Sequence, residues 1–496
     1  MDGKYLKIKQ STIYALIALA VPTIIEQIMS TLLTYVDTAM VGRLGEKATA
    51  SVSVTTTITW LAYCIPAALG IGTQALVARS LGEGNNKKIR ITAGTAVRLA
   101  LLFGVLIEIV GIVIAPFIPA WMGADAAIRS TATAYFTILC IPFFIRAYSS
   151  VAAAALRGVK DSKTPMIIGL FENVLNVVLN YLLIYTFGLG VIGAAIASAV
   201  SYGIGGLVFV VAVRKNEFLS SGTSAEGKGA EAIPDLSAGN VLNKADDTVD
   251  SKCAHGPKGE KETYVNGKAG HNFNLDAMRE IINIGLPVFG ANLAACSGYV
   301  IFAAQVSSLG TTIFAAHSIA VTAEQIFYIA GYGIKTATTT LIGISRGEGN
   351  KAKYLHICRV AILLTFGMQV FNGFMLYVFA LPLMNLFTSS GEVALIGAAV
   401  LRIVAFSEPF YGLRIVTEGV FYGLGRSRYP FITELIGMWL IRIVPTVLYV
   451  AYGGSNLNVI WYFMIADNIT KSLLLLVPTV FFGGRLFDGK QRVRSL

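Results

Sequence analysis

The chain is 496 residues long, and 55% of these residues are hydrophobic whereas only 14% are charged. Soluble domains carry about 25% charged residues, so this composition, with a mean hydropathy of +0.67, excludes a soluble globular protein and indicates a polytopic membrane protein. The net charge of +11 does not indicate a nucleic-acid partner, because the basic residues gather in alternate connections between apolar runs.

The expected elements are transmembrane helices, because a helix needs about 20 apolar residues to cross the hydrocarbon core of a bilayer. The sequence predicts an all-α fold with twelve such helices in two pseudosymmetric six-helix bundles. In chain order the spans are expected near residues 13–41, 51–79, 93–118, 130–156, 165–187, 190–213, 281–307, 313–342, 357–385, 393–423, 430–452 and 456–483.

The distribution of basic residues predicts the orientation of these spans. Basic residues cluster in alternate connections between the spans, for example Lys87 with Lys88 and Arg214 with Lys215. By the positive-inside rule these connections are cytoplasmic, so both termini of a multi-pass plasma-membrane protein are expected in the cytoplasm. The apolar run that follows MDGKYLKIKQ is too long for a signal-peptide core, so we expect it to remain as the first span.

An acid interrupts the first span in the stretch TYVDTAMVGRLG, residues 34–45. An ionised carboxylate in the bilayer costs at least about 2.5 kcal/mol, so we expect Asp37 to have a function. Glu26 precedes it on nearly the same helix face, about 20° away around the axis and roughly 16 Å along it. Pro22 removes a backbone hydrogen bond and predicts a bend in this helix.

The fifth span contains a line of amides in the stretch ENVLNVVLN, residues 172–180. Asn173, Asn176 and Asn180 follow the spacing i, i+3, i+7 and so share one face of a helix. Amides in hydrocarbon need partners, and either a carboxylate with its proton or cation, or simple packing between helices, supplies them. We favour the first interpretation because Asp37 lies in the same half of the chain.

An internal repeat divides the chain into two halves. The motif GEGN occurs at residues 82–85 and again at 347–350, and Pro22 is matched by Pro287, in each case 265 residues later. The predicted domains are an N-terminal six-helix lobe over residues 1–213 and a C-terminal six-helix lobe over residues 277–496. The intervening residues 214–276 are rich in Gly, Ser, Ala and charged residues, which is typical of a disordered cytoplasmic linker.

The second half does not repeat the acid of the first span, because the position equivalent to Asp37 is Phe302. Its intramembrane charges include two pairs at i, i+4 spacing, which are expected to neutralise one another: Arg414 with Glu418, and Asp467 with Lys471. Glu324 has no such neighbour in sequence and is the better candidate to meet a cationic solute. The predicted substrate-binding residues of the whole chain are Glu26, Gln27, Tyr35, Glu324, Gln325 and Tyr328.

Nothing in the sequence predicts enzymatic chemistry or a cofactor. The pattern GxxxxGK[ST] is absent, so the chain has no visible means of hydrolysing ATP, and the five cysteines and four histidines have no metal-binding spacing. The stretch GLGVIG, residues 188–193, fits a dinucleotide fingerprint but joins two spans, so we interpret it as a glycine-rich hairpin. We expect no enzyme and no cofactor beyond a coupling ion.

Taken together, four sequence patterns resemble the MATE family, multidrug and toxic compound extrusion. They are VDTAMVGRLG, the duplicated GEGN pattern, ALRGVKDSKTP and NVLNVVLNYLLIYTFGLGVIGAAIAS. The resemblance covers nearly the whole chain except residues 214–276. It implies an efflux antiporter that exchanges protons or sodium ions for small, cationic, amphipathic solutes by alternating access, embedded in lipid and expected to be a monomer.

The resemblance also implies roles for individual residues. Asp37 matches a first-helix aspartate that takes the coupling proton, Pro22 matches the proline at which that helix bends, and Asn176, Asn180 and Ser198 match polar positions nearby. A sodium ion at Asp37, Asn176 and Asn180 is the alternative to a proton. A flippase for lipid-linked oligosaccharides or other lipids is the alternative function, and it would prefer basic residues in the central cavity, for which Arg146 and Arg414 are the candidates.

Overall fold

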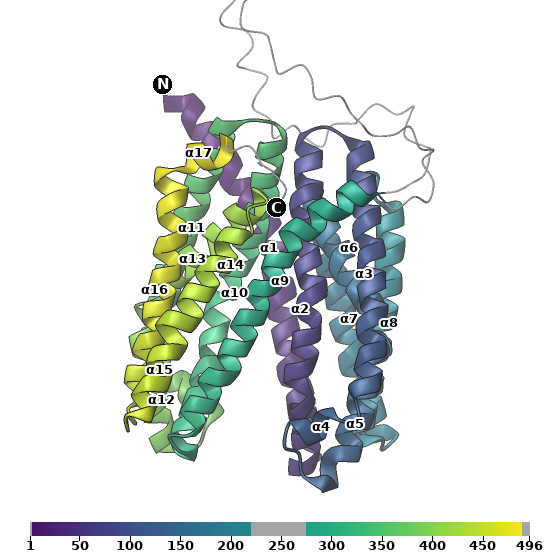
Figure 1. Ribbon diagram of the computed structural model, residues 1–496, viewed down its shortest axis with the longest axis vertical. Coiled ribbons are helices and arrows are strands. Elements are labelled where there is room, and N and C mark those ends of the chain that lie inside the picture. Colours follow the sequence, from purple (N-terminus) through teal and green to yellow (C-terminus); the bar gives the residue numbers. More distant parts are fainter. Residues whose placement is uncertain (1, 220–273, 489–496) are drawn as a thin grey trace, which may run out of the picture.

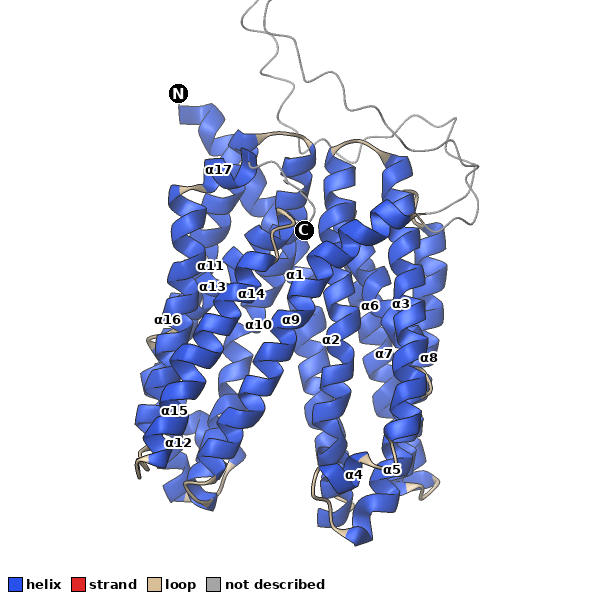
Figure 2. Ribbon diagram, in the orientation of Figure 1, coloured by secondary structure: helices blue, strands red, loops and turns tan. Residues whose placement is uncertain are grey.

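The computed structural model describes residues 2–219 and 274–488, with only the helical backbone described over residues 2–10. Every regular element in these ranges is a helix (Figure 2). This confirms the predicted all-α fold class. The predicted linker falls largely on residues 220–273, outside the described residues, so the domain boundaries at its two ends stay predictions.

The first half contains α1 to α8 (Figure 1). Their bounds are α1 Asp2–Gly42, α2 Glu46–Gly82, α3 Asn86–Ile114, α4 Ile118–Trp121, α5 Ala126–Cys140, α6 Phe143–Gly158, α7 Lys163–Tyr181 with a π-helical continuation Leu182–Thr186, and α8 Gly190–Lys215. Helix α1 continues through Pro22 without ending.

The second half contains α9 to α17. Their bounds are α9 Leu275–Ser307, α10 Thr311–Gly347, α11 Lys351–Phe387, α12 Gly391–Ala405, α13 Glu408–Gly423, α14 Arg428–Glu434 with a π-helical continuation Leu435–Ile443, α15 Val444–Ala451, α16 Leu457–Phe481 and α17 Gly483–Asp488.

Ten helical segments in the described ranges are long and apolar enough to cross a membrane, and the number rises to twelve if each of two bent pairs is one span. The bent pairs are α5 with α6, at 48°, and α12 with α13, at 57°. They are the fourth and tenth predicted spans. Both breaks fall at the same place in the repeat, before Pro142 in one half and before Ser407 in the other, so the predicted span count agrees with the structure.

Helix α1 is shared between the two bundles. Its first part, with Leu16, Leu19 and Ala20, is buried in a core that also contains Val416 of α13 and Tyr354 of α11. Its second part packs against α7 of its own half. Helix α1 therefore forms part of the contact between the two bundles.

The duplicated GEGN motif forms the same turn between two helices in both halves. Asn85 and Asn350 cap the next helix by accepting hydrogen bonds from the backbone N–H of Lys88 and Lys353, both at 2.9 Å. The glycine just before each asparagine has φ +67°, a left-handed conformation that suits glycine. The motif is therefore a helix stop, a turn and a helix cap.

The first glycine of each motif lies where α2 and α10 cross. A Cβ on Gly82 would meet the carbonyl oxygen of Ile344, and a Cβ on Gly347 would meet that of Arg79. This reciprocal contact brings the two halves together at the end of the molecule that carries the N-terminus (Figure 1). Away from this end the two groups of helices separate in Figure 1.

Halfway along the molecule a pair of thiols joins α2 to α9. The Sγ atoms of Cys64 and Cys296 are 3.7 Å apart, and both residues are buried. On the next turn Trp60 and Tyr299 approach with ring centroids 6.5 Å apart, and both of these side chains are exposed. The thiols thus lie at the boundary between the buried part and the exposed part of the contact between α2 and α9.

This contact predicts a crosslink between the halves. In a Cys253→Ser background with a protease site introduced between residues 215 and 275, diamide is expected to oxidise the Cys64 and Cys296 thiols to a disulfide. After cleavage the two halves should migrate as one species on a non-reducing gel. Cys64→Ser should abolish the crosslink, whereas Cys140→Ser should keep it. If the two halves of the folded, oxidised and cleaved protein migrate separately although Cys64 and Cys296 are both present, the packing of α2 on α9 is contradicted.

Candidate functional site

A network of polar side chains links α1, α7 and α8 inside the first half. The Nδ2 atom of Asn180 donates to Oδ1 of Asp37 at 2.6 Å and to Oδ1 of Asn176 at 2.8 Å. Asn176 in turn donates to the hydroxyl of Ser198 at 3.2 Å. The structure therefore brings together all four residues of the predicted ion-coupling set.

Burial and helix geometry explain how this network forms. Asn176 and Asn180 are one helical turn apart on α7 and only 2% and 1% exposed, so each amide must find its partner inside the protein. Asp37 is half-buried on α1, five residues before that helix ends. Asn173, which also belongs to the predicted line of amides, makes no hydrogen bond within the described residues.

Two oxygen atoms of the network remain available. Oδ2 of Asp37 accepts no hydrogen bond from any described residue, and the buried Oδ1 of Asn180 has no partner either. The Asn180 amide has thus used both of its N–H donors while these two acceptors are left over. An arrangement with spare acceptors can take up a proton or a small cation.

The other predicted residues of α1 have different surroundings: Glu26 and Tyr35 have partners on other helices, whereas Gln27 is exposed. Both carboxylate oxygens of Glu26 accept from the Nη2 of Arg157 on α6, at 2.6 and 2.7 Å. The hydroxyl of Tyr35 donates to the backbone oxygen of Thr322 on α10, at 3.4 Å, and Gln27 is exposed. In this conformation the charge of Glu26 is therefore neutralised by a partner that the sequence did not predict.

Sequence reasoning missed an acidic residue, Glu172, in the same interior. The Arg146 guanidinium of α6 lies between the rings of Tyr63 and Tyr202, 4.8 and 4.4 Å from their centroids. Glu172 of α7 is within electrostatic range of Arg146 and precedes Asn176 by one helical turn. That i, i+4 spacing was the signal in the sequence that would have added Glu172 to the polar face of α7.

A second acidic cluster lies in the other half, on α10, α11 and α13. Glu324 and Glu408 are 7% and 1% exposed and within electrostatic range of each other. Gln369 donates to Oε2 of Glu408 at 3.0 Å, while Oε1 of Glu408 is buried without a partner. Glu408 is thus a second candidate that the sequence did not single out, because its neighbours come from other helices.

Tyrosines form one wall beside this cluster. The rings of Tyr328 and Tyr411 are 4.9 Å apart between centroids, and Tyr328 also meets the edge of Tyr332 at 5.9 Å. Tyr328 follows Glu324 by one turn of α10, with the predicted Gln325 between them. Aromatic faces beside carboxylates are suited to hold an organic cation.

Seven further charged side chains of the second half form one alternating chain of ion pairs. The six links are Lys335 to Glu418 at 2.7 Å, Glu418 to Arg414 at 3.0 Å, Arg414 to Glu434 at 2.9 Å, Glu434 to Lys471 at 2.9 Å, Lys471 to Asp467 at 2.9 Å, and Asp467 to Arg442 at 2.8 Å. The two i, i+4 pairs predicted from sequence are confirmed. Each of these charges has an opposite neighbour, as buried charges require.

Comparison with known proteins identifies the family to which the chain belongs. The MatE family model matches residues 22–182 and 287–448. The chain belongs to the MatE family. The two matched stretches begin 265 residues apart, which is the period of the internal repeat, so each half of the chain carries one copy of the family's unit.

Similar proteins cover nearly the whole chain. The chain is 27% identical to the probable multidrug resistance protein NorM of Thermotoga maritima, over 97% of this chain and 95% of that protein. Its fold matches an aspartate-to-asparagine variant of the Vibrio cholerae MATE transporter VcmN with a TM-score of 0.81 and 19% identity, covering 97% of this chain and all of that one. A MOP superfamily transporter from Pyrococcus furiosus matches with a TM-score of 0.81 and 20% identity over 99% of both chains.

Membership of the MatE family settles the broad class. This is a transporter family, so the chain is a transporter and not an enzyme, and its multiple spans make it a membrane protein. Within the described residues, no three His, Cys, Asp or Glu side chains come together in a way that could hold a metal ion.

The chain of ion pairs predicts a large structural effect of losing one central cation. Lys471→Met would leave Glu434 and Asp467 short of a partner in a site where the lysine is 0% exposed, so the free energy of unfolding should fall by about 3 kcal/mol or more. Lys351→Met removes the pair with Asp488, whose side chains are 44% and 58% exposed, and should cost no more than about 1 kcal/mol. Unfolding in detergent measures both, and equal losses would contradict the structural role of the chain.

Proposed function

We propose that this MatE-family protein exports organic cations across the cell membrane in exchange for protons. The observation that carries the proposal is the hydrogen bond from Asn180 to Asp37 in a network with spare acceptors. The family relatives support export of small molecules, since the Thermotoga maritima relative is named a probable multidrug resistance protein.

Asp37 supplies the coupling step in this proposal. Removal of a carboxyl group from water favours its neutral form, while the Asn180 amide favours the charged form. The balance changes when the site opens to one side or the other. Asp37 takes up a proton when it faces outward and releases it when it faces the cytoplasm, and only the charged form attracts a positive solute.

The driving force depends on the charge that moves. Exchange of one proton for one monovalent cation moves no net charge, so only the pH difference drives it, at about 1.36 kcal/mol per pH unit. A neutral solute, or a second coupling ion, adds about 2.3 kcal/mol per 100 mV. A sodium ion held by Asp37 with the amide oxygens of Asn176 and Asn180 is the alternative coupling ion, and the unpartnered Oδ1 of Asn180 supports it.

The cationic solute is assigned to the second half. Glu324 and Glu408 provide negative charge, and the tyrosine wall of Tyr328 and Tyr411 provides ring faces. Glu26, Gln27 and Tyr35 remain proposed contacts from α1, with the condition that a solute must compete with Arg157 for Glu26. The monomer is the proposed functional unit.

We further propose that the side on which the two halves meet is cytoplasmic. The lysines that follow each GEGN motif at the starts of α3 and α11 lie at that end, as does the N-terminus (Figure 1). With this orientation the present conformation is closed to the cytoplasm. The alternate state would separate the crossing of α2 with α10 at Gly82 and Gly347.

The alternative function as a lipid flippase has weaker support. Arg414 is neutralised by Glu418 and Glu434, and Arg146 is covered by two tyrosine rings. The Arg414 guanidinium is therefore not free to receive a phosphate in the central region. Flipping of a fluorescent lipid, with no export of any cation, would overturn the proposal in favour of this alternative.

Replacement of the coupling acid tests the proposal directly. Asp37→Asn is expected to lower the initial rate of export of a fluorescent organic cation by at least about tenfold, because an amide cannot carry a proton cycle. Vesicles with imposed pH and sodium gradients measure this rate and identify the coupling ion. Glu108→Gln, an acid on α3 outside both clusters, should export at the wild-type rate. Wild-type export by Asp37→Asn under both gradients would refute the coupling role.

The amide network predicts a second, separate effect. Asn180→Leu removes the donor to Asp37, and loss of a hydrogen bond to a charged group lowers the export rate by about tenfold. The same transport assay measures it. Asn173→Leu is the matched control on the same helix, and export should be little changed because that amide has no partner in the described structure. Equal effects of the two leucine variants would mean that the network is only packing.

A further inference from the structure

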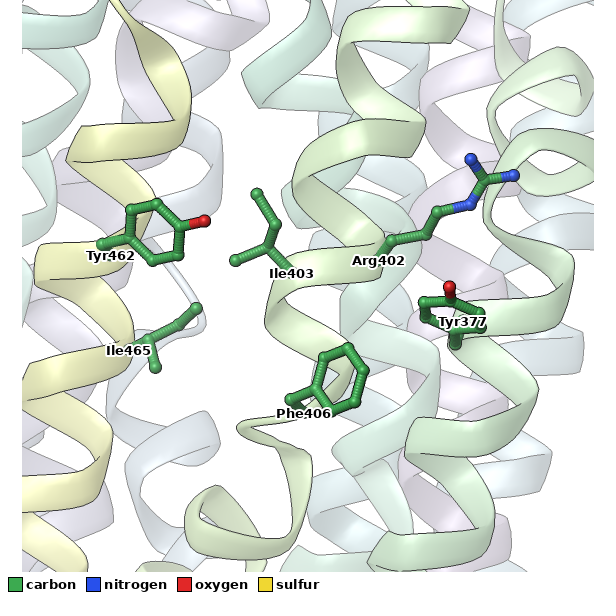
Figure 3. Close-up of a pocket in the computed structure, with 6 residues that line it drawn as sticks. All are labelled: Tyr377, Arg402, Ile403, Phe406, Tyr462 and Ile465. Atoms are coloured by element: carbon green, nitrogen blue, oxygen red, sulfur yellow. The ribbon is translucent and has the colours of Figure 1, made fainter.

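A lipid-facing cavity lies on the outer surface of the second half. Its volume is about 400 Å³, and it is lined by Tyr377, Arg402, Ile403, Phe406, Tyr462 and Ile465 (Figure 3). These residues come from α11, from α12 and its end, and from α16. The cavity is separate from both polar clusters described above.

The lining residues face away from the protein core. Tyr377 is 45% exposed, Tyr462 is 54% exposed and Phe406 is 73% exposed. The buried side of α12, with Leu401 and Ala405, packs instead into the second half. The cavity is therefore a recess on the flank of the bundle, where the surroundings are lipid.

Arg402 lies deep within the hydrocarbon region. It follows Gly391, the first residue of α12, by eleven residues, which is about 16 Å along a helix. Four residues later α12 gives way to the bend that leads to α13. A long side chain on a helix points back toward the helix N-terminus, so the guanidinium is directed toward the surface from which α12 begins.

Three polar groups in this cavity lack partners. Within residues 2–219 and 274–488, neither the Arg402 guanidinium nor the hydroxyls of Tyr377 and Tyr462 make a hydrogen bond or an ion pair. By contrast, Arg414 and Arg442 of the same half are both paired. Polar groups that face hydrocarbon need a partner, and here the protein does not provide it.

The missing partner must combine a negative headgroup with an apolar tail. Arginine binds phosphate oxygens through its planar set of donors, and the hydroxyl of Tyr377, which lies on the same side of α12 (Figure 3), adds a further donor. Phe406, Ile403 and Ile465 offer an apolar surface for an acyl chain. No carboxylate lines the cavity, so nothing there would attract the ammonium group of a zwitterionic lipid.

We propose that this cavity is a binding site for an anionic glycerophospholipid of the surrounding leaflet. The phosphate lies on Arg402 on the side of α12 that carries the Tyr377 hydroxyl (Figure 3), and one acyl chain follows the aromatic and aliphatic wall. The site is independent of the transported solute, so its failure would leave the transport proposal intact.

Native mass spectrometry of the full-length, detergent-solubilised protein tests this site, with phosphatidylglycerol and phosphatidylcholine as the probes. Wild-type protein should bind phosphatidylglycerol at least about tenfold more tightly than phosphatidylcholine, and Arg402→Gln should remove that preference. Lys47→Gln, which removes one exposed positive charge on the same side of the molecule, should leave the preference unchanged.

A second variant keeps the test valid if Arg402→Gln fails to fold. Tyr377→Phe retains the ring and removes the hydroxyl on the Arg402 side, and should weaken phosphatidylglycerol binding by about threefold or more, whereas Tyr462→Phe should leave it unchanged. Equal binding of both lipids by wild-type protein would overturn the proposal. It would also be overturned by unchanged phosphatidylglycerol binding in Arg402→Gln, or by a wild-type dimer that this variant converts to a monomer.

Discussion

The cost of a charge in hydrocarbon is the constraint on which the rest of this structure depends. A buried ion must be paired, held by polar groups or exposed to something that compensates it. The second half shows the first solution in its alternating chain from Lys335 to Arg442. Asp37 shows the second, because the neutral amide of Asn180 holds it without cancelling its charge. Arg402, which is exposed on the flank of the second half, shows the third in the lipid site that we propose.

The way in which a buried charge is compensated distinguishes residues that stabilise the fold from residues that can change their charge during transport. A carboxylate fixed between two cations gains nothing from a proton, so Asp467 is suited to structure. A carboxyl group that receives one amide hydrogen bond and keeps a free oxygen can change its charge at modest cost. Asp37 satisfies this condition in the first half, and Glu408, with its unpartnered Oε1, satisfies it in the second.

The internal repeat duplicates the architecture but not the chemistry. GEGN ends one helix and caps the next in both halves, and the bent spans break at equivalent positions. The polar interiors differ, since Asp37 is replaced by Phe302 at the equivalent position. Backbone geometry is thus shared because both halves must pack helices in the same way, while side chains in the interior diverged into a titratable network and a chain of ion pairs.

The sequence by itself determined the membrane class, the spans, the repeat, the i, i+4 ion pairs and Asp37 as the unusual acid, because composition and helical periodicity act within one segment. Only the tertiary structure decided that Arg157 neutralises Glu26, that Gln369 holds Glu408 and that Arg402 has no partner. These relations join helices far apart in the chain. Helical periodicity tells which side chains share a face, but which neighbour that face meets depends on how the two bundles pack.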